Sequence, residues 1–255
     1  MKNTELPGTI QSVGLACVTL PDRQGQETAL TRKPVAAALI TLQERSDGHR
    51  EIIAATMSDA RDMEFPLPWL VDQALVAGAP TIISGADRAV LCADAMARRF
   101  WAEPKLADVC LGTNVIDPCD MPGGRAGDEV ALCRRLQIPT SQVSDREVER
   151  IWSRPEPDAA INVALGIAAA RLMLWAHGAA FAFAEPNAFF ETLLPLRDWM
   201  IGEEKTWPSL HRAVRSRPIS RASSFASTYR SYRAARDAGD EQVRMTTFED
   251  GLFHT

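Results

Sequence analysis

The sequence lacks several features that would assign the protein to a class directly. It has no run of about 18 uncharged apolar residues, which argues against a membrane-spanning helix. The segment Met1–Gly8 lacks the apolar core of a signal peptide. The glycines of Met121–Arg125 are not followed by Lys-Ser/Thr, so a phosphate-binding loop is not indicated. The sequence also shows no internal repeat. We therefore expect a cytoplasmic protein that makes no contact with a membrane.

Cysteine is also scarce, and its distribution is uninformative for metal binding. The five cysteines are scattered and mostly have apolar neighbours, without a Cys-x-x-Cys pair or a histidine at zinc-ligand spacing. These surroundings predict buried, reduced thiols. A disulfide or metal role stays open, because Cys110 and Cys119 could approach each other across a loop.

Charge is distributed unevenly along the 255 residues. The net charge is −5, but Lys205–Arg236 contains eight basic residues and no acidic residue. The other 20 basic residues accompany all 33 acidic ones, a balance of −13. An acidic body with a basic tail suggests a partner that the tail contacts.

The first part of the chain reads as β-structure. Ser12–Asp22 is a short apolar run that ends in a Pro-Asp turn signal, and its lack of polar alternation predicts a central strand covered on both faces. Pro34–Leu42 and Glu51–Met57 are typical of two further strands, joined by an Asp-Gly turn. Three consecutive strands with short turns predict an antiparallel start to a sheet. Pro80–Gly85 predicts a fourth strand.

Helical patterns dominate the rest. We expect helices from Pro66 or Pro68 to Gly78, from Asp87 to Phe100, over 128–136, from a Ser-x-x-Glu capping box at 144, from Asp158 through Leu174, and over 186–201. The fold class is therefore α/β, with a mixed sheet flanked by helices. Beyond Lys205 the chain is rich in Ser, Arg and Ala with little apolar periodicity, which predicts a segment that is disordered or ordered only on binding.

Several strings resemble predicted 3′–5′ exonucleases related to the exonuclease domain of family B DNA polymerases, which are DEDD proofreading exonucleases of the ribonuclease-H-like superfamily. Leu15–Asp22 is similar to the family's first motif, apolar-Asp-apolar-Glu-Thr-apolar-Pro-Asp. Ile82–Leu91 is similar to the second, an apolar strand, a polar turn and Phe-Asp-x-Pro-Val-Leu. Further similar strings are Ala107–Val109, Leu132–Pro139, and Asn162–Ile167, which falls on Tyr-x-x-x-Asp-Val.

The resemblance, which spans roughly Val13 to Phe181, implies a ribonuclease-H-like domain, to which we assign residues 1–204 with the later helices; the composition predicts a basic, flexible tail over 205–255. It also implies a degenerate site. The family's first two metal-binding carboxylates fall on Ala16 and Val18, its second-motif aspartate on Asp87, and its last motif on Asn162 and Gly166. Two-metal hydrolysis needs hard oxygen ligands around two cations about 4 Å apart. Because Ala16, Val18 and Gly166 offer no side-chain oxygen, we expect no catalytic residue, no metal and no cofactor.

Alternatives remain at single residues. Asp87 is also suited to cap the helix that follows it. An active exonuclease using Mg²⁺ or Mn²⁺ would need relocated carboxylates, for which Asp22, Asp87 and Asp108 are the candidates. His177 is expected to be a packed histidine or one that interacts with a helix dipole.

The basic tail is the candidate nucleic-acid contact, because arginine neutralises phosphates and aromatic rings stack on unpaired bases. The residues concerned are Arg212, Arg215, Arg217, Arg221, Tyr229, Arg230, Tyr232, Arg233 and Arg236. The function predicted first is a catalytically impaired exonuclease-fold protein that serves as an accessory or scaffold subunit on nucleic acid, single-stranded or within a complex, together with a protein partner. The rivals are the active exonuclease and a protein-interaction module without nucleic-acid binding.

Overall fold

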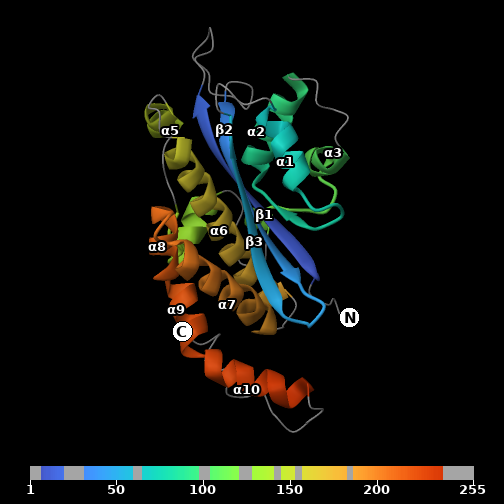
Figure 1. The fold of residues 1–255 in the computed structure, drawn as a ribbon, viewed down its shortest axis with the longest axis vertical. Helices are drawn as coiled ribbons and strands as arrows, with labels where there is room; N and C mark the ends of the chain where they lie inside the picture. Colours follow the sequence, from blue (N-terminus) through green and yellow to red (C-terminus); the bar gives the residue numbers. More distant parts are fainter. Residues whose placement is uncertain are drawn as a thin grey trace.

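A computed structural model of the chain describes residues 7–19, 32–59, 65–97, 104–120, 128–140, 145–152, 157–182 and 186–237. Helices pack on both faces of a five-stranded mixed sheet (Figure 1). The predicted α/β class, with a mixed sheet flanked by helices, is confirmed.

The sheet has the order β3-β2-β1-β4-β5. Its strands are β1 (Thr9–Thr19), β2 (Arg32–Glu44), β3 (Arg50–Ser58), β4 (Thr81–Ile82) and β5 (Val115–Ile116). The first three strands pair antiparallel, whereas β4 is parallel to β1 and β5 is parallel to β4. The predicted antiparallel start and the central place of β1 are both confirmed.

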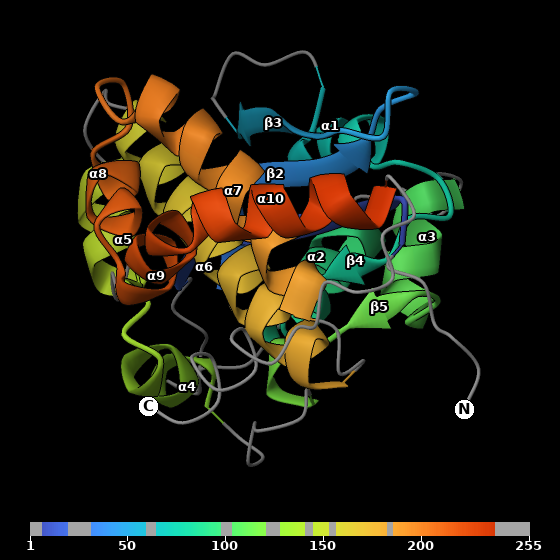
Figure 2. The same cartoon turned by 90° about the horizontal axis from the view of Figure 1, so that it is seen from below.

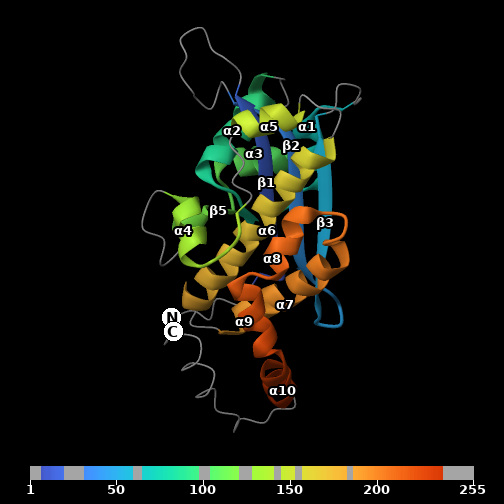
Figure 3. The same cartoon turned by 90° about the vertical axis from the view of Figure 1, so that its left-hand side faces the viewer.

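Side chains of β1 alternate between two cores, as the pleat of a strand requires. Val13, Leu15 and Cys17 pack towards one face, which is covered by α1 (Leu67–Ala74), α2 (Gly85–Ala97) and α3 (Pro104–Leu111). Ile10, Ala16 and Val18 belong to the larger core on the other face. Figure 3 shows α6 (Pro157–Ala182) lying along that face.

The close approach of α6 to β1 depends on small residues. A Cβ atom on Gly14 would lie 2.0 Å from the carbonyl oxygen of Ala164 and 2.7 Å from the nitrogen of Ala168, so only glycine fits this position. Two residues earlier on β1, the hydroxyl of Ser12 donates to the carbonyl of Ala168 at 2.8 Å. The backbone of α6 therefore lies directly on the central strand.

By length and composition alone, α6 could cross a membrane over Asp158–Ala180. However, 78% of its apolar window is buried inside the protein, against the sheet and the next helix. Packing within the fold therefore accounts for the apolar character of this helix.

The remaining helices are α4 (Glu129–Arg135), α5 (Asp145–Trp152), α7 (Pro186–Glu203), α8 (Pro208–Val214), α9 (Arg217–Ser224) and α10 (Ala226–Asp237), with a 3₁₀ turn at Pro118–Asp120. The predicted helices over 128–136 and 186–201 are confirmed. Ser144, the first residue of the expected capping box, lies outside the described residues.

The segment beyond Lys205, predicted to be disordered or ordered only on binding, instead forms the helices α8, α9 and α10 between Pro208 and Asp237. Each of α8, α9 and α10 buries a pair of residues three positions apart in the larger core. These pairs are Leu210 and Ala213, Ile219 and Ala222, and Ala226 and Tyr229. The sequence pattern was weak because half of these residues are alanines, yet residues at this spacing share one helix face. Residues 238–255 lie outside the described part of the chain.

Candidate functional site

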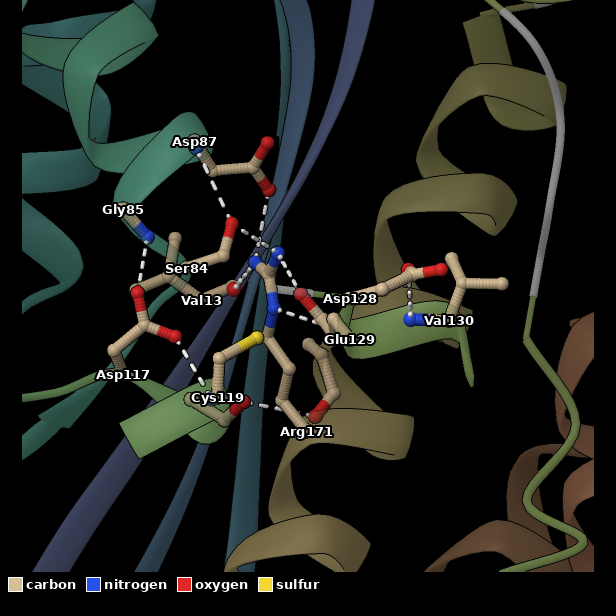
Figure 4. A network of polar contacts seen from close by, with 12 residues as sticks. Val13, Ser84, Gly85, Asp87, Asp117, Cys119, Asp128, Glu129, Val130 and Arg171 are labelled. Atoms are coloured by element: carbon tan, nitrogen blue, oxygen red, sulfur yellow. Dashed lines mark hydrogen bonds and ion pairs between the residues drawn. The ribbon is translucent and has the colours of Figure 1, made fainter. Parts of the chain in front are cut away.

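A buried arginine, Arg171 of α6, is the centre of a polar cluster beside the carboxyl end of β4 (Figure 4). Its side chain is only 3% exposed. Arginine carries five N–H donors and cannot lose its charge in a protein, so burial requires acceptors and negative charge around it. The surrounding residues supply both.

Five acceptor contacts match those five donors. Nη1 donates to the carbonyl of Val13 at 2.6 Å and lies 2.8 Å from Oδ2 of Asp87. Nη2 donates to the hydroxyl of Ser84 at 2.8 Å and to Oε2 of Glu129 at 2.9 Å. Nε donates to Oε1 of the same glutamate at 2.9 Å, which makes the Glu129 contact bidentate. The guanidinium therefore has no donor left for another group.

Local sequence positions both carboxylates. Ser84 accepts a hydrogen bond from the backbone N–H of Asp87 at 3.3 Å, in the first turn of α2. Asp128 caps α4 by accepting from the N–H of Val130 at 2.9 Å, which holds Glu129 at the first position of that helix. The prediction that Asp87 itself caps its helix is wrong, because the helix begins at Gly85 and the Asp87 carboxylate points to Arg171.

A third carboxylate supports the loop beside the cluster without contacting Arg171. Asp117 accepts from the N–H of Gly85 at 2.7 Å and from the N–H of Cys119 at 2.9 Å. These bonds tie the start of α2 to the turn that follows β5, as Figure 4 shows. The carboxylate is thus committed to backbone donors.

The electrostatics of the cluster favour a fixed positive charge. Burial opposes the charge of Arg171, but Asp87 and Glu129 outweigh it and raise the pKa of the guanidinium above its usual value. Two nearby thiols have raised pKa values, which is the opposite of what a nucleophilic cysteine needs. Burial and then Asp117 raise the pKa of Cys119 to about 11, and burial and then Glu129 raise the pKa of Cys133 to about 12. Both thiols therefore stay protonated at neutral pH and are poor nucleophiles.

All five cysteines are free, as expected for reduced thiols. Cys17 and Cys133 are buried, while the other three are half-buried. The hydrogen-bonding neighbour of Cys110 is Cys92 rather than Cys119.

The positions that the resemblance assigns to metal ligands have different surroundings. Ala16 and Val18 are buried among apolar residues of the larger core. Oδ1 of Asn162 accepts from the N–H of Ser209 at 2.9 Å and so serves the start of α8. Gly166 is buried within α6. Of these positions, Asp87 is the one whose side chain reaches the Arg171 cluster.

The described residues of the Arg171 cluster do not fit a pair of divalent cations. Both carboxylates of the cluster are engaged by Arg171, and bringing two further cations beside a buried guanidinium is strongly unfavourable. Asp108 is exposed on α3, where it lines a separate small cavity with Gln11 and Thr81. Asp22 lies outside the described residues. Among the residues that the structure describes, no group of three or more His, Cys, Asp or Glu could hold a metal ion.

The predicted nucleic-acid residues differ in how far their side chains are exposed to solvent. Arg212, Arg215, Arg217 and Arg230 are exposed, and Arg221, Tyr232 and Arg233 are half-buried. Tyr229, by contrast, is buried, stacks on Phe190 with ring centroids 4.9 Å apart, and donates to Glu191 at 3.1 Å. Its ring is therefore not free to stack on a base, which corrects that part of the prediction. The side chain of Arg236 lies outside the described ones.

Sequence reasoning missed Arg171 and Glu129. A signal existed for the first, because Arg171 is the one charged residue between Ala159 and Ala182, in a segment that otherwise has the composition of a core helix. A charge within such a segment needs a partner. Glu129 gave no signal, since 42 residues separate it from Arg171 and only the fold brings them together.

In comparisons with known proteins, no family model, no curated protein and no solved structure matched the chain.

Proposed function

We propose that the protein is a catalytically impaired member of the ribonuclease-H-like exonuclease fold that acts as an accessory or scaffold subunit on nucleic acid. The sheet supports the fold part of this proposal, because its first three strands are antiparallel and parallel strands follow. The motif strings at Leu15–Asp22 and Ile82–Leu91 supply the resemblance to exonucleases.

The observation that carries the proposal is the saturation of Arg171. Among the positions aligned with the family's metal ligands, Asp87 alone is still an acid, and its carboxylate is paired at 2.8 Å with a guanidinium that also engages Glu129. A permanent monovalent cation thus takes the carboxylates that divalent ions would need. The cluster stabilises the junction of β1, α2, α4 and α6 and leaves no base free to activate water.

Exposed arginines support the nucleic-acid part. From Lys205 to Arg236 the chain carries eight basic residues without an acid, and α8 and α9 present Arg212, Arg215 and Arg217 to solvent. Each is available to neutralise a phosphate and release a counterion. The acidic remainder of the chain disfavours contact with nucleic acid elsewhere.

A nuclease assay tests the impaired site. Wild type should degrade single- and double-stranded substrates with Mg²⁺ or Mn²⁺ no faster than Asp87→Asn, since Asp87 performs no chemistry. Asp158→Asn is the matched control, because that carboxylate is exposed and lies outside the cluster. Degradation that disappears in Asp87→Asn and Glu129→Gln but persists in Asp158→Asn would overturn the proposal in favour of an active exonuclease.

Binding of a labelled single-stranded oligonucleotide over a series of salt concentrations tests the second part. The affinity should fall steeply with salt, and removing three phosphate contacts should reduce the slope by about 2. The triple variant is Arg212→Gln, Arg215→Gln and Arg217→Gln. The control triple changes exposed arginines of α4 and α5: Arg134→Gln, Arg135→Gln and Arg150→Gln. Absence of binding, or binding that ignores salt, would favour the protein-interaction module instead.

A further inference from the structure

A groove of about 650 Å³ lies between the start of β3, the helix α7 and the last described helix, α10. Figure 2 shows α10 running across α7 on this side of the molecule. Pockets that hold small ligands are commonly 300–1,000 Å³. This groove lies outside the Arg171 cluster and shares no residue with it.

Arg50 lines the groove in an unusual state for a buried cation. Its side chain is 6% exposed, and its Nη1 is buried without a hydrogen-bond partner among the described residues. Its two carboxylate neighbours are distant: Nε lies 3.7 Å from Glu191 and Nη2 lies 3.8 Å from Glu44. These separations exceed those of a hydrogen bond, so the guanidinium has unused donors.

Each acid of the groove already has a polar contact with a protein group. Glu191 accepts from the hydroxyl of Tyr229, and Asp198 pairs with Arg197. Asp47 accepts from the N–H of His49 at 3.0 Å, and Glu51 accepts from the amide of Gln43 at 2.8 Å. Arg230, in contrast, is exposed at the groove without a partner among the described residues. Arg50 and Arg230 therefore keep donors that the acids of the groove do not use, and such donors suit an anionic group.

Two further features suit a flat heterocycle. Trp199 is half-buried in the groove wall, and among the described rings none is stacked on it. Pro195 lies within α7 and has no N–H to donate to the carbonyl of Glu191, four residues earlier. Both residues line the groove. An aromatic side chain and two cations with unused donors thus line one cavity.

We propose that this groove binds one nucleotide unit, with its phosphate on Arg50 and Arg230 and its base on Trp199. The unit is either a free nucleoside monophosphate or a terminal nucleotide of a single strand. The second form rests on the proposed nucleic-acid association and gives it a site for a strand end, whereas the first does not depend on it.

Calorimetric titration of the full chain tests the site with adenosine 5′-monophosphate and with adenosine. The monophosphate should bind about tenfold or more tightly than adenosine, because charge-assisted bonds to arginine need the phosphate. Arg50→Met and Trp199→Leu should each weaken monophosphate binding about tenfold. Matched controls outside the groove, Arg134→Met and Trp69→Leu, should leave it unchanged.

Two oligonucleotide arms separate the sources of the ligand. If the site takes a strand end, a 5′- or 3′-phosphorylated oligonucleotide should bind more tightly than its unphosphorylated form, and Trp199→Leu should remove the difference. If only the free monophosphate responds to the variants, the ligand is a free nucleotide.

The result that overturns the inference is equal binding of monophosphate and adenosine, or no response to Trp199→Leu, or no binding at millimolar concentration. Trp199→Leu keeps this outcome decisive if Arg50→Met fails to fold. Salt-sensitive oligonucleotide binding that depends on Arg212, Arg215 and Arg217 but not on Trp199 would reject the groove and leave the proposed function standing. Absence of all oligonucleotide binding, with monophosphate binding intact, would reject the proposed nucleic-acid function and leave the groove as a site for a free nucleotide.

Discussion

Arg171 and Arg50 are both withdrawn from solvent, with 3% and 6% of their side chains exposed, but their surroundings differ. Arg171 has an acceptor for every donor, and its contacts lie between 2.6 and 2.9 Å. Arg50 has two carboxylates at 3.7 and 3.8 Å and an Nη1 atom without a partner. The first belongs to α6, the helix that touches the central strand, and the second lines a groove.

The comparison shows that burial alone does not assign a role to a charged residue. A saturated guanidinium stabilises the fold in which it is embedded, and removing it leaves buried carboxylates without compensation. An unsaturated one contributes little to the fold, because its desolvation is poorly compensated. It is then available for a ligand. The following predictions are ordered from the largest expected effect to the smallest.

Arg171→Met should lower the free energy of unfolding by about 3–5 kcal/mol, because Asp87 and Glu129 lose their shared partner. Urea denaturation measures this. Arg134→Met, an exposed residue of α4, should change the free energy by no more than about 0.5 kcal/mol. A loss below about 1 kcal/mol for Arg171→Met would mean that the cluster is not the stabilising element described above.

Gly14→Ala should lower the free energy of unfolding by about 3 kcal/mol, since its Cβ would press into the backbone of α6 at Ala164 and Ala168. This contact sets how closely Arg171 approaches β1. Gly202→Ala is the matched control: no atom lies within 4 Å of the added Cβ, so alanine should stabilise the helix by about 0.5–1 kcal/mol. Equal effects of both substitutions would argue against the close packing of α6 on β1.

His177 lies on the same helix as Arg171 but resembles Arg50, because its Nε2 is buried without a partner among the described residues. It packs edge-on against Phe189, as expected for a packed histidine. Burial, and then Arg221, lower the pKa of this imidazole from 6.5 to about 4. The unfolded chain therefore binds more protons between these values, and stability falls as the pH decreases through this window.

The loss attributable to His177 should reach about 3 kcal/mol at pH 4, since each pKa unit corresponds to about 1.4 kcal/mol. Denaturation of wild type and His177→Phe at pH 8 and pH 4.5 isolates this contribution from that of the carboxylates. The variant should lose less stability than wild type on acidification. Parallel losses in the two proteins would show that His177 accepts a proton in the folded state.

Arg50→Met should change the free energy of unfolding by about 1 kcal/mol or less, since methionine removes a poorly matched buried charge while Glu191 keeps its bond to Tyr229. The same substitution at Arg171 provides the contrast. Thermal and urea unfolding of the two variants side by side check it. A loss of about 3 kcal/mol or more for Arg50→Met would show that this arginine belongs to the fold, and the distinction between the two would fail.

Much of the fold was predictable because it depends on local patterns. The apolar run at Ser12–Asp22 indicated a central strand, and the helices at 128–136 and 186–201 followed from caps and periodicity. The last three helices were missed, because each contributes only two residues to the larger hydrophobic core and stability comes from docking on α6 and α7. Sequence placed Asp87 near a helix start but assigned it the role that Ser84 performs.

The sequence by itself determined the α/β class, the antiparallel opening of the sheet, the uneven charge and the absence of carboxylates at Ala16 and Val18. These properties follow from residue type and nearest-neighbour spacing. Only the tertiary structure decided what the charged residues contact. Val13, Asp87 and Glu129 meet Arg171 across 158, 84 and 42 residues of chain, and Arg50 lies far from every residue of α7 and α10 in sequence. Whether a buried charge is saturated or left with free donors depends on such long-range contacts, and no local pattern records them.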